Sequence, residues 1–157
     1  MNRRRKLLCT GLVGFGTLVL VAARLVPGSA QQASPPSQPT RHAVALLRVV
    51  NDAESHYHTG SAAYATWDQL SKSGIPQGIV AQTEERLSKT GAPEMARPRF
   101  NLDSPQPLPG YVLSLYLSAD GSHYLCSLRD DGKEACGPSF FTDDSGLILQ
   151  AKAIGCR

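Results

Sequence analysis

The spacing of apolar residues predicts one well-defined helix in the first half of the chain. Apolar side chains recur there at steps of three and four and therefore share one helical face: Ala43, Leu46, Leu47, Val50, Ala53 and Tyr57. Thr40 is placed to act as the N-cap, and the segment 58–61 is expected to stop the helix. We therefore expect a helix over residues 41–57 that contributes a large part of the core.

Two weaker helical patterns follow. Thr66 and Gln69 have the spacing of a capping box, which predicts a short helix within residues 64–70. Its inward side chains are expected to be Trp67 and Leu70. A further helix fits residues 79–89, with an inward side formed by Ile79, Val80, Thr83 and Leu87. The prolines that follow up to Pro109 favour irregular structure, because proline lacks an amide donor and restricts the preceding residue.

Short runs rich in β-branched and aromatic residues predict about four strands in the last third of the chain. They cover residues 111–118, 123–128, 139–142 and 147–151. Asp, Ser and Gly separate these runs, as in the segment Asp143-Asp144-Ser145-Gly146, and these residues form tight turns. The expected fold is therefore α+β, with one long N-terminal helix packed on one face of an antiparallel meander.

The first thirty residues are expected to direct export. Basic residues at 3–6 precede an uncharged, mostly apolar run at 7–23, and Gly28-Ser29-Ala30 supplies the small residues of a cleavage site. Residues 1–30 are thus a signal peptide or, if uncleaved, a membrane tether through 7–23. Both alternatives place the remainder outside the cytoplasm, in the periplasm or the medium. Residues 31–40 are rich in Pro, Ser and Gln and are interpreted as a linker to a globular domain at 41–157.

The charge balance changes once the leader is set aside. The whole chain has a formal net charge of +3, with 16 Lys and Arg and 13 Asp and Glu residues. Five of the basic residues lie in the leader, so 11 remain against 13 acidic ones and the net charge becomes −2. This composition leaves no basic surface of the kind that binds nucleic acid.

The polar residues do not form a recognisable catalytic or metal-binding motif. The histidines at 42, 56, 58 and 123 are accompanied by no HExxH, CxxC or calcium-type loop and are interpreted as exposed surface residues. Asp143 and Asp144 are interpreted as turn formers rather than as an acid–base pair. Ser139 does not lie in a GxSxG motif. We expect a protein that is not an enzyme and that has no cofactor or metal site.

Three cysteines follow the leader: Cys126, Cys136 and Cys156. An exported protein permits disulfides, so one bridge and one remaining thiol are expected. A tight hairpin centred on Asp131 would place Cys126 opposite Cys136, whereas the last hairpin brings Cys136 towards Cys156. The spacing leaves both pairings open.

Several short segments, in their order and spacing, resemble type IV pilin and pseudopilin-like proteins. They are LLRVVNDAESHY at 46–57, YATWDQL at 64–70, Gly110-Tyr111 at the start of a strand, and FFTDDSGLI at 140–148. The resemblance implies a pilin-head-like domain. It also favours a Cys136–Cys156 bridge, because many pilins have a disulfide-bonded loop at the C-terminus.

The N-terminus departs from the pilin pattern. Gly14-Phe15 imitates the prepilin cleavage junction, but the apolar run already starts at Leu7. Val19 stands where prepilins carry glutamate, and the linker at 31–40 interrupts the long helix. The expected function is therefore that of an exported, non-enzymatic domain that binds an unknown protein partner or acts as a scaffold in the cell envelope. The alternative is a secreted inhibitor or small-ligand binding module that uses the loops at 75–109.

Overall fold

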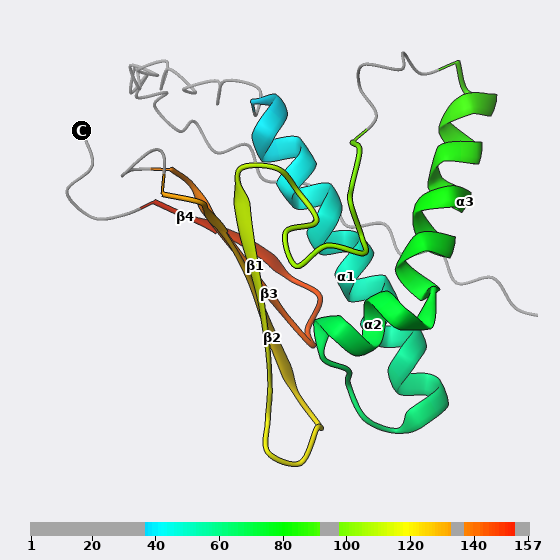
Figure 1. Cartoon of the computed structure of the whole chain (residues 1–157), viewed down its shortest axis with the longest axis vertical. Coiled ribbons are helices and arrows are strands. Elements are labelled where there is room, and N and C mark those ends of the chain that lie inside the picture. Colours follow the sequence, from blue (N-terminus) through cyan, green and yellow to red (C-terminus); the bar gives the residue numbers. More distant parts are fainter. Residues whose placement is uncertain (1–36, 92–97, 133–136, 153–157) are drawn as a thin grey trace, which may run out of the picture. The chain divides into compact units, whose positions relative to one another are not determined.

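In the described residues of the computed structural model, three helices precede a four-stranded antiparallel sheet (Figure 1). The structure describes residues 37–91, 98–132 and 137–152. The helices are α1 (Gln38–Ser61), α2 (Trp67–Ser73) and α3 (Ile75–Lys89), and the strands are β1 (Tyr111–Leu117), β2 (Tyr124–Asp130), β3 (Ser139–Asp143) and β4 (Ile148–Ala151). Each strand pairs with the next, in the order β1-β2-β3-β4. The expected α+β class and antiparallel meander are confirmed.

Helix α1 is longer at both ends than the apolar pattern predicts. Ser37, not Thr40, is its N-cap, and the Ser37 side chain accepts a hydrogen bond from the Thr40 backbone N–H. Pro39 lies in the first turn, where the missing amide costs nothing. Residues 38–40, predicted to belong to the linker, are thus helical. The helix ends when Ala62 adopts a left-handed conformation and donates its N–H to the His58 carbonyl, so residues 58–61 form its last turn.

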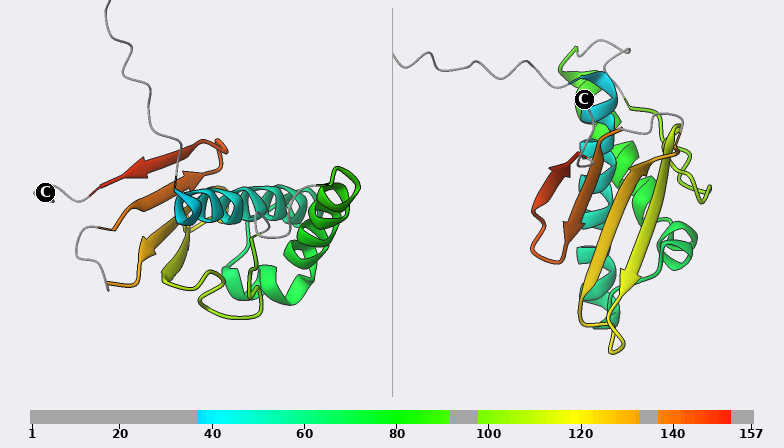
Figure 2. Two further views of the ribbon diagram at one scale, coloured as in Figure 1. Left: turned by 90° about the horizontal axis from the view of Figure 1, so that it is seen from above. Right: turned by 90° about the vertical axis from the view of Figure 1, so that its left-hand side faces the viewer.

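The core lies between α1 and the sheet. The predicted inward residues Ala43, Leu46, Leu47, Val50 and Ala53 are buried, and Tyr57 is half-buried. Helix α1 also packs against α3 on its other side, which buries Val49 as well. Viewed from above, all three helices lie on the same side of the sheet, with α1 nearest to the strands (Figure 2).

The short helices α2 and α3 meet at Gly74. The predicted capping box is present in α2, with Thr66 and Gln69 bonded reciprocally. Leu70 is buried as predicted, and half-buried Trp67 donates from Nε1 to the Ser104 carbonyl at 3.1 Å. Gly74 has a positive φ of 75°, which ends α2 and lets α3 begin at once, four residues earlier than predicted.

One predicted inward residue of α3 is exposed. Thr83 faces solvent, whereas Ile79, Val80 and Leu87 are half-buried. The prediction for Thr83 was wrong because α3 packs mainly on α1 and α2, so its buried stripe is narrower than the stripe of a helix within a core.

The sheet register gives two distinct faces. Tyr124, Cys126 and Leu128 of β2 point towards α1 and are buried, together with Phe140 and Thr142 of β3. Cys126 lies opposite Thr142, and Arg129 lies opposite Ser139. The predicted alternative with Cys126 opposite Cys136 was wrong, because β2 continues to Asp130 and the connection to β3 is longer than a tight turn.

Candidate functional site

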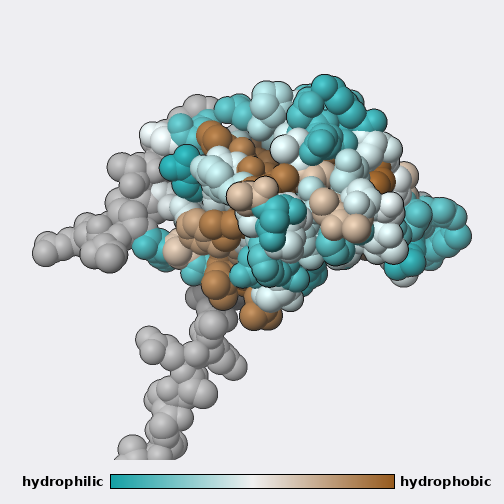
Figure 3. Space-filling model, turned by 90° about the horizontal axis from the view of Figure 1, so that it is seen from below, coloured by the Kyte–Doolittle hydropathy of each residue, from teal (hydrophilic) through white to brown (hydrophobic). Residues whose placement is uncertain are grey.

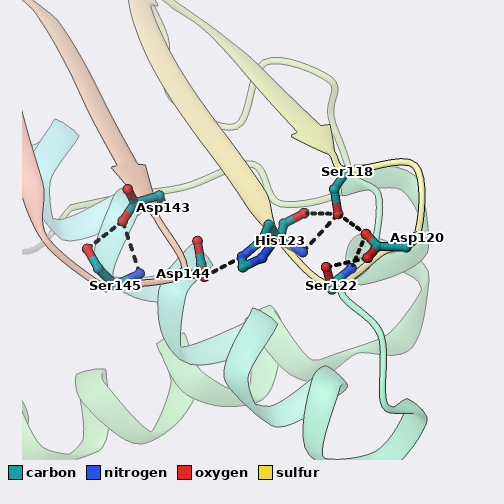
Figure 4. Close-up of polar contacts among 7 residues, drawn as sticks. All are labelled: Ser118, Asp120, Ser122, His123, Asp143, Asp144 and Ser145. Atoms are coloured by element: carbon teal, nitrogen blue, oxygen red, sulfur yellow. Dashed lines mark hydrogen bonds and ion pairs between the residues drawn. The ribbon is translucent and has the colours of Figure 1, made fainter.

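Two hairpin turns at one end of the sheet bring together a group of hydrogen-bonded polar side chains (Figure 4). His123 Nδ1 lies 2.8 Å from Asp144 Oδ2 and joins the β1–β2 turn to the β3–β4 turn. We call this group the hairpin-tip cluster: Ser118, Asp120, Ser122, His123, Asp143, Asp144 and Ser145. The sequence pattern did not predict the His123–Asp144 contact, because it joins residues from separate hairpins.

The remaining contacts of the hairpin-tip cluster stay within each turn. Asp120 accepts hydrogen bonds from the Ser118 hydroxyl at 2.6 Å and from both the hydroxyl and the N–H of Ser122. The bond from Ser118 is the main cause of the lowered pKa of Asp120. Asp143 Oδ1 accepts in the same way from the N–H and the hydroxyl of Ser145. These bonds confirm the interpretation of Asp143 as a turn former, and Asp120 has the same role in the β1–β2 turn.

The His123–Asp144 pair is a hydrogen-bonded pair that becomes an ion pair when His123 is protonated. A carboxylate on Nδ1 can orient an imidazole so that Nε2 acts as a base, as in hydrolases. The hydroxyls of Ser118, Ser122 and Ser145 are bonded to aspartates and not to the His123 ring. Within the described ranges, no group of three His, Cys, Asp or Glu side chains could hold a metal ion. The cluster is therefore suited to joining two turns.

Removal of the Asp144 charge is expected to lower the pKa of His123. The hydrogen bond that the His123 ring donates to Asp144 raises the pKa of His123 above 6.5, and the same bond lowers the pKa of Asp144 below 3.8. The pair therefore stabilises the fold between these pH values. It is lost in acid as Asp144 protonates and in base as His123 loses its proton. In Asp144→Asn, the His123 midpoint measured by NMR should move towards 6.5, whereas Glu84→Gln, at an exposed site on α3, should leave the His123 midpoint unchanged.

A second polar group lies between α1 and the sheet. Asn51 Oδ1 accepts hydrogen bonds from the Tyr124 hydroxyl at 2.9 Å and from the Thr142 hydroxyl at 3.0 Å. Its Nδ2 donates to the Gly146 carbonyl at 3.2 Å. One side chain of α1 thus bonds to β2, to β3 and to the β3–β4 turn, and these bonds fix how the helix lies along the sheet.

Glu54 is the least expected buried residue. Its side chain is inaccessible to solvent, and Oε2 accepts a hydrogen bond from the Ala65 N–H at 2.9 Å. Oε1 has no partner among the described residues. Burial raises the pKa of Glu54 from 4.5 to about 7, and the bond from Ala65 offsets part of this rise. A hint was present in the sequence, since position 54 is four residues after Val50 and three before Tyr57.

The histidines of α1 differ in environment. His56 is exposed, as predicted. His58 is half-buried, and its ring stacks on Tyr64 with 4.4 Å between the ring centroids. The prediction of an exposed His58 was wrong because α1 continues for one more turn and turns this ring towards the loop after the helix. His42 is also half-buried.

A groove runs between α1 and α3. Its volume is about 230 Å³, and apolar side chains form most of its wall: Ala45, Val49, Ile79, Val80, Leu87 and Phe100. Arg48, Asp52 and Glu84 border it. A more polar hollow of about 330 Å³ adjoins the groove and is lined by His56, Gln82 and Arg86 among others. This groove is a place where a small apolar group can be enclosed.

Comparison with known proteins gives no relative. No protein family, curated protein or solved structure matches this chain. Function is therefore argued from the residues and surfaces described above. None of the described helices is long and apolar enough to cross a membrane. The predicted leader at residues 1–30, including the possible membrane tether at 7–23, lies outside the described residues.

The predicted Cys136–Cys156 bridge also lies outside the described residues and stays a prediction. Cys126 is a buried free cysteine, and burial raises the pKa of its thiol to about 12, with a smaller contribution from the Glu54 charge. We expect peptide mapping without reduction to link Cys136 to Cys156. An alkylating reagent should modify Cys126 only after the protein is unfolded. A peptide that links Cys126 to Cys136 would contradict the pairing.

Proposed function

We propose that this chain is an exported, non-enzymatic binding or scaffolding component of the cell envelope, built on a pilin-like globular domain. The observation that carries the proposal is the apolar character of the sheet face turned away from α1. Tyr116 and Leu125 are 59% and 47% exposed on that face. Leu147 and Leu149, in and next to β4, are 68% and 63% exposed.

Exposed apolar side chains concentrated on one face of a sheet are typical of a binding surface. Apolar surface also appears in brown on the side of the molecule where the sheet lies (Figure 3). Polar side chains of the hairpin-tip cluster bond mainly to one another, and Asn51 bonds to the sheet. We call the sheet face turned away from α1 the uncovered face, because none of the described helices packs on it. It offers more apolar surface to a partner than the polar groups do.

The pilin-like part of the proposal rests on the resemblance of sequence segments and on the order of elements. A helix precedes an antiparallel meander and packs on one of its faces. Segments 46–57 and 140–148, which carry the resemblance, contribute Val50 and Phe140 to the same core. The departure at the N-terminus means that the proposed role does not include assembly through a long N-terminal helix.

The proposal is tested on the native protein in cell envelopes. Chemical cross-linking and co-purification should recover envelope proteins, and Leu125→Ser should reduce their recovery. Ala81→Ser on the exposed side of α3 is the matched control. N-terminal sequencing gives a second test. Gln31 at the terminus of an exported protein agrees with the proposal, whereas Phe15 in sheared filaments would identify an assembled pilin and contradict it.

The groove between α1 and α3 favours a second candidate, the binding of a small apolar ligand by residues within 75–109. Phe100, Ile79, Val80 and Leu87 come from that part of the chain and form its wall. A fluorescent apolar probe such as anilinonaphthalene sulfonate should bind there. Ala45→Phe should fill the groove and reduce binding, whereas Leu149→Ser on the sheet should leave it unchanged. Equal loss in both variants would exclude the groove.

A further inference from the structure

On the uncovered face of the sheet, one positive and one negative side chain lie on opposite sides of a central residue pair. In the β2–β3 pair, Ser127 lies opposite Phe141, Arg129 opposite Ser139, and Leu125 opposite Asp143. Side chains two residues apart in a strand share a face. Arg129 therefore lies on one side of the Ser127–Phe141 pair, and Asp143 lies at an equal distance on the other side.

This placement makes the face complementary to a copy of itself. Two copies can be stacked with these faces towards each other. A two-fold axis that lies midway between the two sheets, directly over the Ser127–Phe141 pair, then exchanges the two ends of the face. It sets Arg129 of one copy against Asp143 of the second copy, and the reverse contact forms at the same time. Exposed Arg129 of each copy then meets half-buried Asp143 of the other.

We propose that the uncovered face of the β1–β4 sheet binds a second copy of this chain, face to face, through two reciprocal Arg129–Asp143 ion pairs around a centre formed by Phe141. This inference rests on the proposed binding role of the same face and names its partner.

The geometry of such a pair agrees with known sheet packing. Strands rise about 3.4 Å per residue and lie about 4.8 Å apart, so the line from Arg129 to Asp143 is tilted by about 20° from the strands. The two-fold axis perpendicular to this line makes the two sets of strands cross at about 40°. Aligned sheets in β-sandwiches cross at about 30°.

Both charges are available for the contact. Arg129 is exposed, and it has no ion pair among the described residues. Asp143 uses Oδ1 within its turn, which leaves Oδ2 for a second partner. Leu125 and half-buried Val112 lie beside these charges, and the dimer would shield both apolar side chains from solvent. Desolvation around the pairs strengthens their attraction and excludes charges of the wrong sign.

The size of the face predicts a weak dimer. Four strands about 4.8 Å apart and about 20 Å long present roughly 400 Å² per copy, whereas stable specific interfaces bury about 800 Å² per partner. We therefore expect a reversible dimer that dissociates within the range of about 1 µM to about 1 mM.

The test is sedimentation equilibrium of the purified protein with its native N-terminus, over that concentration range. The wild type should show a monomer–dimer equilibrium. Arg129→Asp should raise the dissociation constant by about tenfold or more, because it places like charges opposite each other. Arg86→Asp makes the same charge change on exposed α3, far in sequence from the sheet, and should leave the constant unchanged. Circular dichroism confirms that both variants are folded.

Other outcomes overturn the inference. A monomer at all concentrations contradicts it, as does a dimer that Arg129→Asp and Arg86→Asp weaken equally. Co-sedimentation with phosphatidylglycerol vesicles that is lost in Leu125→Ser would assign the face to a lipid surface instead. A monomer that still co-purifies with envelope proteins would refute the dimer and leave the proposed function standing.

Discussion

Replacement of Glu54 by glutamine is expected to remove most of the pH dependence of stability between pH 4.5 and 7. The carboxyl group ionises near 4.5 in the unfolded chain and near 7 in the folded one. Because the folded pKa is raised, its stabilising contribution is complete below pH 4.5 and is lost as the pH rises to about 7. The loss amounts to about 3 kcal/mol in the free energy of unfolding.

The glutamine variant preserves the main contact of this side chain. Its amide oxygen can still accept the hydrogen bond from Ala65, but it carries no charge into the core. Urea unfolding at several pH values should give a nearly flat profile for Glu54→Gln and a falling one for the wild type. Glu84→Gln, at an exposed site on α3, is the matched control and should retain the wild-type slope. A slope that persists in Glu54→Gln would show that another group causes it.

Truncation of Phe140 should destabilise the protein far more than truncation of its neighbour Phe141. Phe140 is fully buried between α1 and the sheet, near Tyr111, with ring centroids 6.2 Å apart. Phe140→Ala is expected to cost about 3 to 5 kcal/mol, since it removes a large side chain and leaves a cavity. Phe141 is half-buried on the uncovered face, so Phe141→Ala should cost about 1 to 2 kcal/mol.

The pair of phenylalanines also tests the sheet register. If the pairing of β3 shifted by one residue, Phe141 would be buried and Phe140 would lie on the uncovered face. Phe141→Ala would then destabilise the protein more than Phe140→Ala. Chemical unfolding of both variants should be measured at a protein concentration low enough to keep the chain monomeric. Equal losses for Phe140→Ala and Phe141→Ala would contradict the two-faced sheet.

Local patterns in the sequence were sufficient to predict a capping box, the inward face of α1 and one hairpin turn. The capping box of Thr66 and Gln69 and the inward face of α1 depend on residues a few positions apart, and both were predicted. The turn at Asp143 was predicted for the same reason: its side chain bonds to Ser145, two residues on. Propensity and periodicity determine such features before tertiary packing contributes.

Features that depend on distant parts of the chain were missed. Glu54 is buried because the loop after α1 returns and sets the Ala65 N–H against its Oε2, a contact between residues 11 positions apart. The His123–Asp144 contact needs two hairpins to lie side by side. The position of Cys126 opposite Thr142 depends on how far β2 extends. Each is decided by contacts between elements, which a single sequence does not display.

The bonds of Asn51 have a consequence for the time course of folding. Asn51 bonds to Gly146, 95 residues later in the chain, and to Thr142, 91 residues later. The strands, in contrast, pair with their immediate neighbours in sequence. Loop closure over such distances is slow compared with hairpin formation. During synthesis α1 therefore emerges long before its partners, and its docking onto the finished sheet is expected to be the late step.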